Sequence, residues 1–354
     1  MVRYDLEMNS EAPQSERSGP ATMTDVARAA GVSIKSVSRV INREPHVTPK
    51  LRAKIEAAIA ALNYVPETAA RSLAGARSFT ISVLFDNPSP NYTMMVVAGV
   101  YRACTENQYH LRIDTINSAV EPDALKQQLD QILRHSRSDG LVLTPPLTDN
   151  PAVLDFLNTH GIRYCRIAPI FDRETSLEVW IDDAAAAADV ADHFWNLGHR
   201  RFGLVGGPFN HGAARTRREG YIGRLHQLDP SIIVSEADGG FDFEQGIAAG
   251  RELLAARRYP TAIFAANDDS AAGVMAACRE LALDVPGDVS IIGFDDSWVA
   301  KSVWPYLTTI HQPISEMAHA ATCMLLDRSI GAGDTKTQQL DYRLIARASA
   351  GSPR

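Results

Sequence analysis

The sequence has few cysteines and no long apolar run. Its four cysteines lie far apart in the 354 residues, at Cys104, Cys165, Cys278 and Cys323, without the spacing of a metal or redox site. We therefore expect free thiols in a reducing, cytoplasmic compartment. No stretch approaches the roughly 18 apolar residues of a membrane span. The first 20 residues contain four acidic side chains and no apolar core, which does not fit a secretory signal.

The usual signatures of catalysis are also missing. The sequence contains no HExxH, CxxC or GxSxG pattern, and Gly206-Gly207-Pro208 is not a dinucleotide-binding fingerprint. Adjacent carboxylates at Asp268-Asp269 and Asp295-Asp296 leave a glycosidase or a metal enzyme as the alternative. The side chains of sequence neighbours point in different directions, however, which argues against both of these enzymes. We interpret His199 as a structural residue and not as a catalytic one. We expect no enzyme, no metal and no cofactor.

The net charge of −7 is unevenly distributed. Residues 20–80 contain nine Lys or Arg against four Asp or Glu, so this part carries +5 and the remainder −12. A small basic head on an acidic body is typical of a phosphate-binding module joined to a separate control domain.

The basic head contains two short helical patterns within 24–42, TDVARAAGVSIKSVSRVIN. In the second pattern, Val37, Val40 and Ile41 recur at i, i+3 and i+4, which predicts one buried helical face. Between the patterns, Gly31 suits a positive φ and Ser33 suits a helix N-cap. Two short helices joined by such a turn form a helix-turn-helix.

The outer face of this pattern carries polar and basic side chains that suit DNA. Ile34 and Lys35 open the second helix, where side chains reach base edges, and Arg39 lies one turn further on. Thr24, Ser33, Ser38 and Asn42 are small donors suited to phosphate contacts, and Ser36 lies on the same DNA-facing surface. The alternative is a solvated polar face on an ordinary helical hairpin.

The remaining chain divides by composition. Residues 1–21 read as a disordered leader, 22–64 as the head with a third helix capped by Thr48 and Pro49, and 65–78 as a short hinge. Residues 79–346 alternate buried-strand runs with helical patterns, which predicts right-handed crossovers and parallel sheets. The predicted strands include 179–181, 232–235 and a last one near 340–345, and 347–354 is a tail.

So many alternations exceed one doubly wound sheet and predict two α/β lobes. We expect one lobe from roughly 79–180 plus 312–333, and the other from 183–308 plus the C-terminal strand. The predicted fold class is therefore a small all-α helix-turn-helix head plus an α/β body of two doubly wound parallel-sheet lobes.

Several motifs resemble one known family. DVARAAGVSIKSVSRVIN, followed by VTPKLRAKIEAAIAALNYVPETAARSLAGARS, resembles the N-terminus of the LacI/GalR family of transcription regulators. LGHRRFGLVGGP, TAIFAANDDSAAG, VPGDVSIIGFDDS and PYLTTIHQP resemble its body in the same order. The resemblance covers residues 23 to about 346.

The resemblance implies how DNA is bound. It implies a hinge helix in the minor groove of double-stranded operator DNA, with Ala70 and Leu73 at the centre and Leu73 as the wedge. Glu67 and Ala74 depart from the residues common in the family hinge, so its DNA contacts are expected to differ. It also implies a homodimer, or a tetramer built from dimers, on a near-palindromic site.

The resemblance further implies a periplasmic-binding-protein type I body with a small-molecule effector between the lobes. The implied effector-binding residues are Asp86, Tyr92, Arg217, Asn267, Asp268 and Asp295. All of them follow strands or begin helices, where ligands bind in open α/β sheets. Carboxylates, an arginine and an aromatic ring suit a sugar. The plain alternatives are a polar turn for Asp295-Asp296 and helix capping for Asp268-Asp269.

The sequence therefore predicts a DNA-binding repressor of carbohydrate-utilisation genes that is controlled by a sugar. Alternatives within this class are a nucleobase or other non-sugar effector, and co-repression or activation in place of induction. The rival from another class is a carbohydrate-binding protein with no DNA role.

Overall fold

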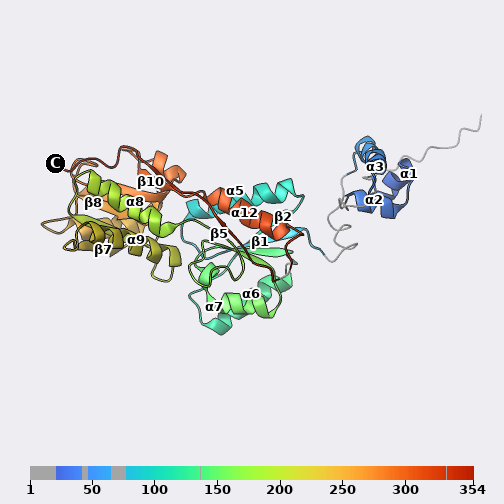
Figure 1. Cartoon of the computed structure of the whole chain (residues 1–354), viewed down its shortest axis with the longest axis horizontal. Coiled ribbons are helices and arrows are strands. Elements are labelled where there is room, and N and C mark those ends of the chain that lie inside the picture. Colours follow the sequence, from blue (N-terminus) through green and yellow to red (C-terminus); the bar gives the residue numbers. More distant parts are fainter. Residues whose placement is uncertain (1–20, 42–46, 65–76, 136, 332) are drawn as a thin grey trace, which may run out of the picture. The chain divides into compact units, whose positions relative to one another are not determined.

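The computed structural model describes residues 21–41, 47–64, 77–135, 137–331 and 333–354 (Figure 1). The chain forms two compact units, 1–77 and 78–354, and each is described by itself. Some predictions lie outside the described residues: the leader 1–20, Asn42, and the hinge positions Glu67, Ala70, Leu73 and Ala74.

Three short helices form the described part of the first unit. They are α1 (Met23–Ala29), α2 (Ile34–Ile41) and α3 (Pro49–Ala61). Gly31 adopts a φ of +55° between α1 and α2, and Ser33 Oγ accepts from the Ser36 amide at 3.1 Å. Thr48 caps α3, with Pro49 in its first turn. The turn and both caps predicted from the sequence are confirmed.

These helices share one small core. The buried residues come from all three helices and from the segment after α3: Val26, Ala27, Ala30, Val37, Val40, Ile55, Ala58 and Tyr64. Helices of this length are marginal alone in water, so this shared core holds them in place.

The second unit contains two six-stranded sheets, each defining a lobe. The first sheet has the order β11-β5-β4-β3-β1-β2, and its strand pairs are parallel. Its strands are β1 (Thr80–Phe85), β2 (His110–Thr115), β3 (Gly140–Leu143), β4 (Tyr164–Ile167), β5 (Leu177–Trp180) and β11 (Lys336–Gln339).

Helices cover both faces of this first sheet. The covering helices are α5 (Pro90–Glu106), α6 (Pro122–His135), α7 (Pro151–Thr159) and α12 (Ile314–Leu326), and a 3-10 turn η1 (Leu147–Asp149) follows β3. Helices α5 and α12 lie on one side and α6 and α7 on the other (Figure 1). Along β1, Val83 packs with the first pair and Leu84 with the second, because successive strand residues face opposite sides.

The second sheet has the order β12-β10-β9-β8-β6-β7. Its strands are β6 (Phe202–Gly206), β7 (Val234–Asp238), β8 (Ala262–Ala265), β9 (Ser290–Asp295), β10 (Thr308–His311) and β12 (Arg343–Ile345). Its helices are α8 (Asp183–Asn196), α9 (Gly212–Leu228), α10 (Phe243–Leu254) and α11 (Asp268–Glu280), with a 3-10 turn η2 (Trp298–Lys301). Helices α8 and α9 share one core with the sheet, and α10 and α11 share another. The predicted fold class is confirmed.

The strands differ from prediction at the sheet edges. The predicted strand 232–235 is wrong in its bounds, since β7 occupies Val234–Asp238. Strands β10 and β11 were not predicted. The four residues of β11, KTQQ, are all exposed, so they show none of the apolar alternation that marks a strand. Strand β12 runs antiparallel to β10, whereas parallel sheets were predicted.

The chain passes between the two sheets at residues 181–182, 312–313 and 340–342. These crossovers place Asp183 and Gln312 where the lobes meet. Among the described residues, no helix is long and apolar enough to cross a membrane.

Candidate functional site

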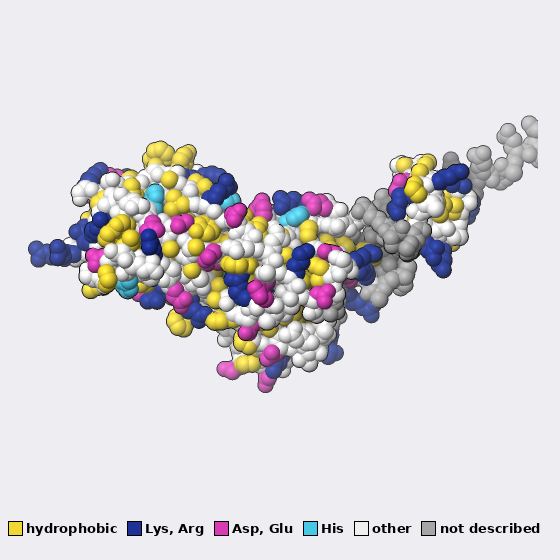
Figure 2. All heavy atoms as spheres, viewed as in Figure 1, with side chains coloured by type: hydrophobic (Ala, Val, Ile, Leu, Met, Phe, Trp, Pro, Cys, Tyr) yellow, Lys and Arg dark blue, Asp and Glu magenta, His cyan; other side chains and the backbone are white. Residues whose placement is uncertain are grey.

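Helix α2 presents an exposed face opposite its buried one. Val37 and Val40 are buried, while Lys35 and Arg39 are exposed and Ile34 is 50% exposed. Ser36 and Ser38 are half-buried beside them, and Thr24 is exposed in the first turn of α1. Lys and Arg side chains also mark the surface of this unit (Figure 2). This arrangement suits a recognition helix in the major groove.

A second polar cluster forms where the lobes of the body meet, around the buried guanidinium of Arg217. Its Nε donates to Asp183 Oδ1 at 2.8 Å, Nη1 to the Ala266 carbonyl at 2.7 Å and Nη2 to Gln312 Oε1 at 3.0 Å. Nη1 also lies 4.0 Å from Asp295 Oδ1. The guanidinium stacks 3.5 Å from the centre of the Phe294 ring, which fixes its orientation.

Tyr92 and Asp295 lie beside this guanidinium. Burial raises the pKa of Asp295 well above its usual range, with Arg217 opposing and nearby carboxyls adding to the shift. Burial likewise raises the pKa of Tyr92, and Asp295 adds to this. Within the described residues, Tyr92 Oη is buried without a hydrogen-bond partner. A buried hydroxyl of this kind is costly unless a ligand or water satisfies it.

The backbone at Asp295 is also unusual. Its φ is +111° and that of Asp296 is +53°. A non-glycine residue with such a φ costs of order 1–3 kcal/mol, and such residues gather at functional sites. Asp295 ends β9 and lies beside Arg217, so the unusual backbone falls within the polar cluster.

Three other predicted effector residues already have partners. The Asp86 carboxylate accepts from the Ser118 amide at 2.8 Å and from its hydroxyl. Asn267 caps α11 through the Ser270 amide. Asp268 accepts from the Ser297 amide at 2.7 Å and from Thr309 Oγ1 at 2.6 Å. Their side chains hold loops and a helix start in place.

Adjacent Asp268 and Asp269 point in different directions, as predicted. Asp268 stays within its own lobe, whereas Asp269 reaches the other lobe. There its carboxylate accepts from Ser89 Oγ and Asn91 Nδ2, each at 2.5 Å. This contact ties the start of α11 to the start of α5.

The lobes also touch at the start of α9. A Cβ built on Gly212 would lie 2.8 Å from Asp149 Oδ2 and 2.7 Å from Ile170 Cγ1. The Asp149 carboxylate accepts from the Ile170 amide at 2.9 Å. Glycine therefore permits a close approach here that a larger residue would obstruct.

Sequence reasoning missed four residues of this cluster: Asp183, Gln312, His211 and Asp269. Gln312 stands within the quoted motif PYLTTIHQP, and His211 follows GGPFN, so both were close to stretches that carried a signal. His211 is 5% exposed, and neither of its ring nitrogens has a partner in the described part of the chain. His199, in contrast, bonds to Thr261 Oγ1 and to the Gly351 carbonyl, which is the structural role predicted for it.

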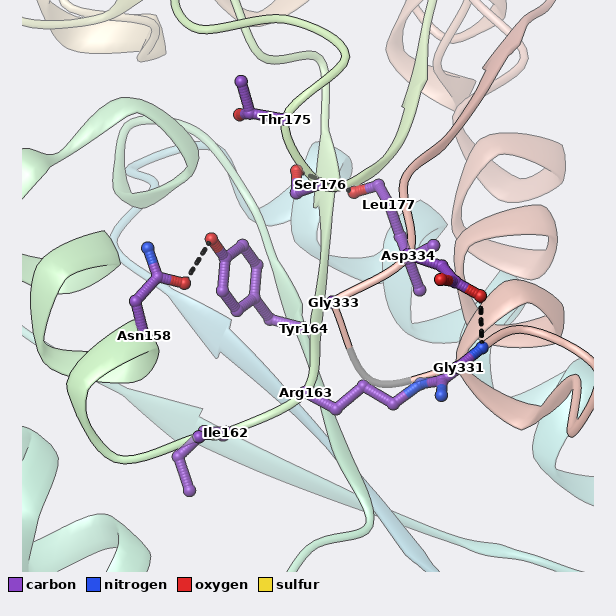
Figure 3. A pocket seen from close by; sticks show the side chains of 11 residues that line it. Asn158, Ile162, Arg163, Tyr164, Thr175, Ser176, Leu177, Gly331, Gly333 and Asp334 are labelled. Carbon is purple, nitrogen blue, oxygen red and sulfur yellow. Dashed lines mark hydrogen bonds between the residues drawn. The ribbon is translucent and has the colours of Figure 1, made fainter.

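A separate cavity of about 220 Å³ lies in the first lobe, away from this cluster (Figure 3). It lies beside the first residues of β4 and β5 and the segment before β11. Tyr164 Oη donates to Asn158 Oδ1 at 3.0 Å at its wall, and the Asp334 carboxylate accepts from the Gly331 amide. None of the predicted site residues lines it. Among the described residues, no cluster of three or more His, Cys, Asp or Glu could hold a metal.

A helix-turn-helix unit joined to a two-lobed α/β unit with a buried polar cluster defines a ligand-controlled DNA-binding transcription regulator. Residues 22–67 match the model of the lacI family of bacterial regulatory proteins, and residues 191–350 match that of the periplasmic binding protein-like domain. The chain belongs to the lacI family. The resemblance seen in the sequence is confirmed.

Known relatives are repressors. The chain is 36% identical over 312 residues to the ribose operon repressor of Escherichia coli (strain K12), covering 87% of this chain and 93% of that one. It is 33% identical over 339 residues to the HTH-type transcriptional repressor PurR of Proteus mirabilis (strain HI4320), covering 93% and 96%. The solved lac repressor dimer bound to operator and the anti-inducer ONPF matches with a TM-score of 0.76, at 28% identity over 94% of this chain and 100% of that chain.

Proposed function

We propose that this regulator represses carbohydrate-utilisation genes and that a sugar bound where the lobes meet changes its affinity for operator DNA. The observation that carries the proposal is the buried group of Tyr92, Arg217 and Asp295. A hydroxyl, a guanidinium and a carboxylate together match the donors and acceptors of vicinal sugar hydroxyls, and the Tyr92 ring can cover an apolar sugar face.

The predicted effector residues then divide into two groups. Tyr92, Arg217 and Asp295 contact the sugar, whereas Asp86, Asn267 and Asp268 hold the surrounding loops through the partners described above. The division into leader, head, hinge, body and tail stays a prediction.

The DNA contacts remain as predicted. The proposed contacts among the described residues are Thr24, Ser33, Ile34, Lys35, Ser36, Ser38 and Arg39. The contacts of Asn42, Ala70 and Leu73 stay predictions outside the described residues.

A sugar contacting both lobes couples to DNA through the lobe arrangement. Tyr92 belongs to the first lobe, and Arg217 and Asp295 belong to the second. A ligand that binds both sides favours one lobe angle over others, and it shifts the equilibrium by its difference in affinity for the two states. Such couplings are typically about 1–3 kcal/mol. Induction and co-repression differ only in the sign of this coupling.

We propose a homodimer as the DNA-binding form. Apolar side chains are exposed on both lobes: Met94, Tyr101 and Ile113 on the first, Trp298, Trp304 and Tyr306 on the second. Exposed apolar patches mark interaction surfaces, and the matching lac repressor was solved as a dimer.

In sedimentation equilibrium, Trp304→Ser should raise the dimer dissociation constant by at least about tenfold. Phe209→Ser, which changes a side chain that is 96% exposed, is the control. A wild-type monomer would contradict the proposal, and a tetramer would extend it.

The relatives are repressors and not enzymes, and we propose that this chain has no catalytic activity. The test is incubation of the purified protein with any sugar that binds it. Turnover that disappears in Asp295→Asn would revive the enzyme alternative.

Fluorescence anisotropy with selected operator DNA and with random DNA tests the regulator itself. We expect tight, sequence-dependent binding that a sugar changes by about 5- to 150-fold. Binding without sequence preference would contradict the proposal.

A thermal-shift screen of sugars, nucleobases and amino acids tests the effector, because a ligand specific for the folded state raises the melting temperature. If nucleobases alone raise it, the sugar assignment is wrong.

A further inference from the structure

The cluster between the lobes is rich in carboxylates. Four of them gather there, because Asp183, Asp268 and Asp269 all lie close enough to Asp295 to raise its pKa. The charge of Arg217 is offset by Asp183 at 2.8 Å, and the Asp295 carboxyl lies 4.0 Å from Arg217 Nη1. Arg217 can therefore donate to a neutral oxygen, but it offers no excess positive charge to an anion.

Three other arginines near the cluster, Arg166, Arg173 and Arg215, also have acidic partners. Arg166 is fully buried and its Nη2 lies 3.1 Å from Glu178 Oε2. Arg215 lies 3.9 Å from Glu219 Oε1, and its guanidinium packs over Phe171. Arg173 Nε lies 3.7 Å from Glu178 Oε1, so it shares this carboxylate with Arg166, and its guanidinium packs over Trp180. Each of these three arginines therefore has an acidic partner.

His211 adds a polar group without a charge. Its ring meets Phe241 edge-on at 4.8 Å between centroids. Burial lowers the pKa of His211 to about 3, and Arg217 adds to this, so the imidazole is neutral near pH 7. A neutral imidazole has one N–H donor and one acceptor nitrogen. Neither has a partner among the described residues, which is the state expected of a group that binds a hydroxyl.

We propose that the effector is an uncharged polyol, an unphosphorylated sugar, and that His211 is a specificity-determining residue that binds one of its hydroxyls. This rests on the proposed function, since it names the effector class of the same site. A phosphate or carboxylate would be buried beside Asp183 and Asp295 without a free cation, which is unfavourable. Hydroxyls instead satisfy Tyr92 Oη and both His211 nitrogens.

Isothermal titration calorimetry on the full chain tests the charge class with matched probes. The probes are D-ribose with ribose 5-phosphate, and D-glucose with glucose 6-phosphate and gluconate. We expect one neutral sugar to bind and its charged derivative to bind at least about thirtyfold more weakly, which is roughly 2 kcal/mol.

Two variants test His211. His211→Ala should weaken binding of the neutral sugar by at least about tenfold, and His211→Asn should restore part of it because the amide keeps a donor and an acceptor. The matched control is Phe209→Ala on the same loop, whose side chain is 96% exposed; it should stay within about twofold of wild type. Melting curves of all variants show whether each is folded.

Each outcome decides a different point. Equal or tighter binding of a phosphate ester or gluconate overturns the uncharged class and leaves the sugar regulator standing. Wild-type affinity in both His211→Ala and His211→Asn overturns the role of His211. Binding of nucleobases alone, or of no probe, overturns this inference together with the sugar assignment, whereas the DNA-binding assay judges the regulator independently.

Discussion

The ion pair between Asp183 at the start of α8 and Arg217 on α9 gives the sharpest test of the buried polar cluster. Asp183→Ala removes the carboxylate that accepts from Arg217 Nε at 2.8 Å and leaves a guanidinium that is 6% exposed. Breaking a buried pair typically costs about 3–5 kcal/mol. The Ala266 carbonyl and Gln312 Oε1 still accept from the guanidinium, so we expect a smaller loss of about 2–3 kcal/mol.

Thermal melting at one fixed protein concentration measures this loss. At about 2–4 °C per kcal/mol for a domain of this size, the melting temperature should fall by about 4–12 °C. Asp192→Ala on the same helix α8 is the matched control. Its carboxylate accepts from Arg224 Nε at nearly the same distance, 2.9 Å, but both side chains are 36% exposed. Such pairs contribute about 0–1 kcal/mol.

The melting temperatures of the two variants show whether burial strengthens the ion pair. Equal shifts in Asp183→Ala and Asp192→Ala would show that burial of the pair adds nothing. The double variant Asp183→Ala/Arg217→Met removes the stranded charge as well, so its loss should be smaller than the sum of the single losses. An additive double variant would contradict the ion-pair interpretation.

Three further predictions concern the head, a buried acid and a helix crossing. Arg39→Ala should weaken operator binding by about 1–3 kcal/mol if Arg39 reads a base; an equal loss on random DNA in the same anisotropy assay would mark a phosphate contact. Burial raises the pKa of Asp268 from 3.8 to about 7, so the folded state binds more protons than the unfolded state between these values, and stability falls as pH rises through them by at most about 1.4 kcal/mol per pH unit. Urea unfolding should show this slope in wild type and its reduction in Asp268→Asn; an unchanged slope would contradict the shift. Gly220→Ala would put a Cβ within 3.0 Å of the Ala184 carbonyl oxygen and should destabilise by about 1–3 kcal/mol. Gly223→Ala, on the same helix α9 with open space around it, should stabilise by about 0.5–1 kcal/mol; melting shifts of the same sign would refute the assignment of this crossing.

The cluster between the lobes could be predicted only in part. Asp295 and Arg217 were predicted from the resemblance to the LacI/GalR family, which places them where strand ends and helix starts gather on one edge of a parallel sheet. Asp268 was predicted for the same reason, yet its carboxylate turned towards Ser297 and Thr309. A position after a strand fixes where a residue lies, but the direction of its side chain depends on neighbours from distant segments.

The sequence alone determined the features that depend on local interactions. The turn at Gly31, the caps at Ser33 and Thr48 and the central strands follow from conformational preference, short-range hydrogen bonds and continuous apolar runs. The tertiary structure decided what depends on chain crossings. Asp183 and Gln312 reach Arg217 because the chain passes between the sheets beside them, and the exposed edge strand β11 forms because β5 offers it backbone partners. No local pattern encodes the two contacts of Arg217, because Asp183 and Gln312 lie 34 and 95 residues away from it in the sequence. The folding of the sheets brings these residues together.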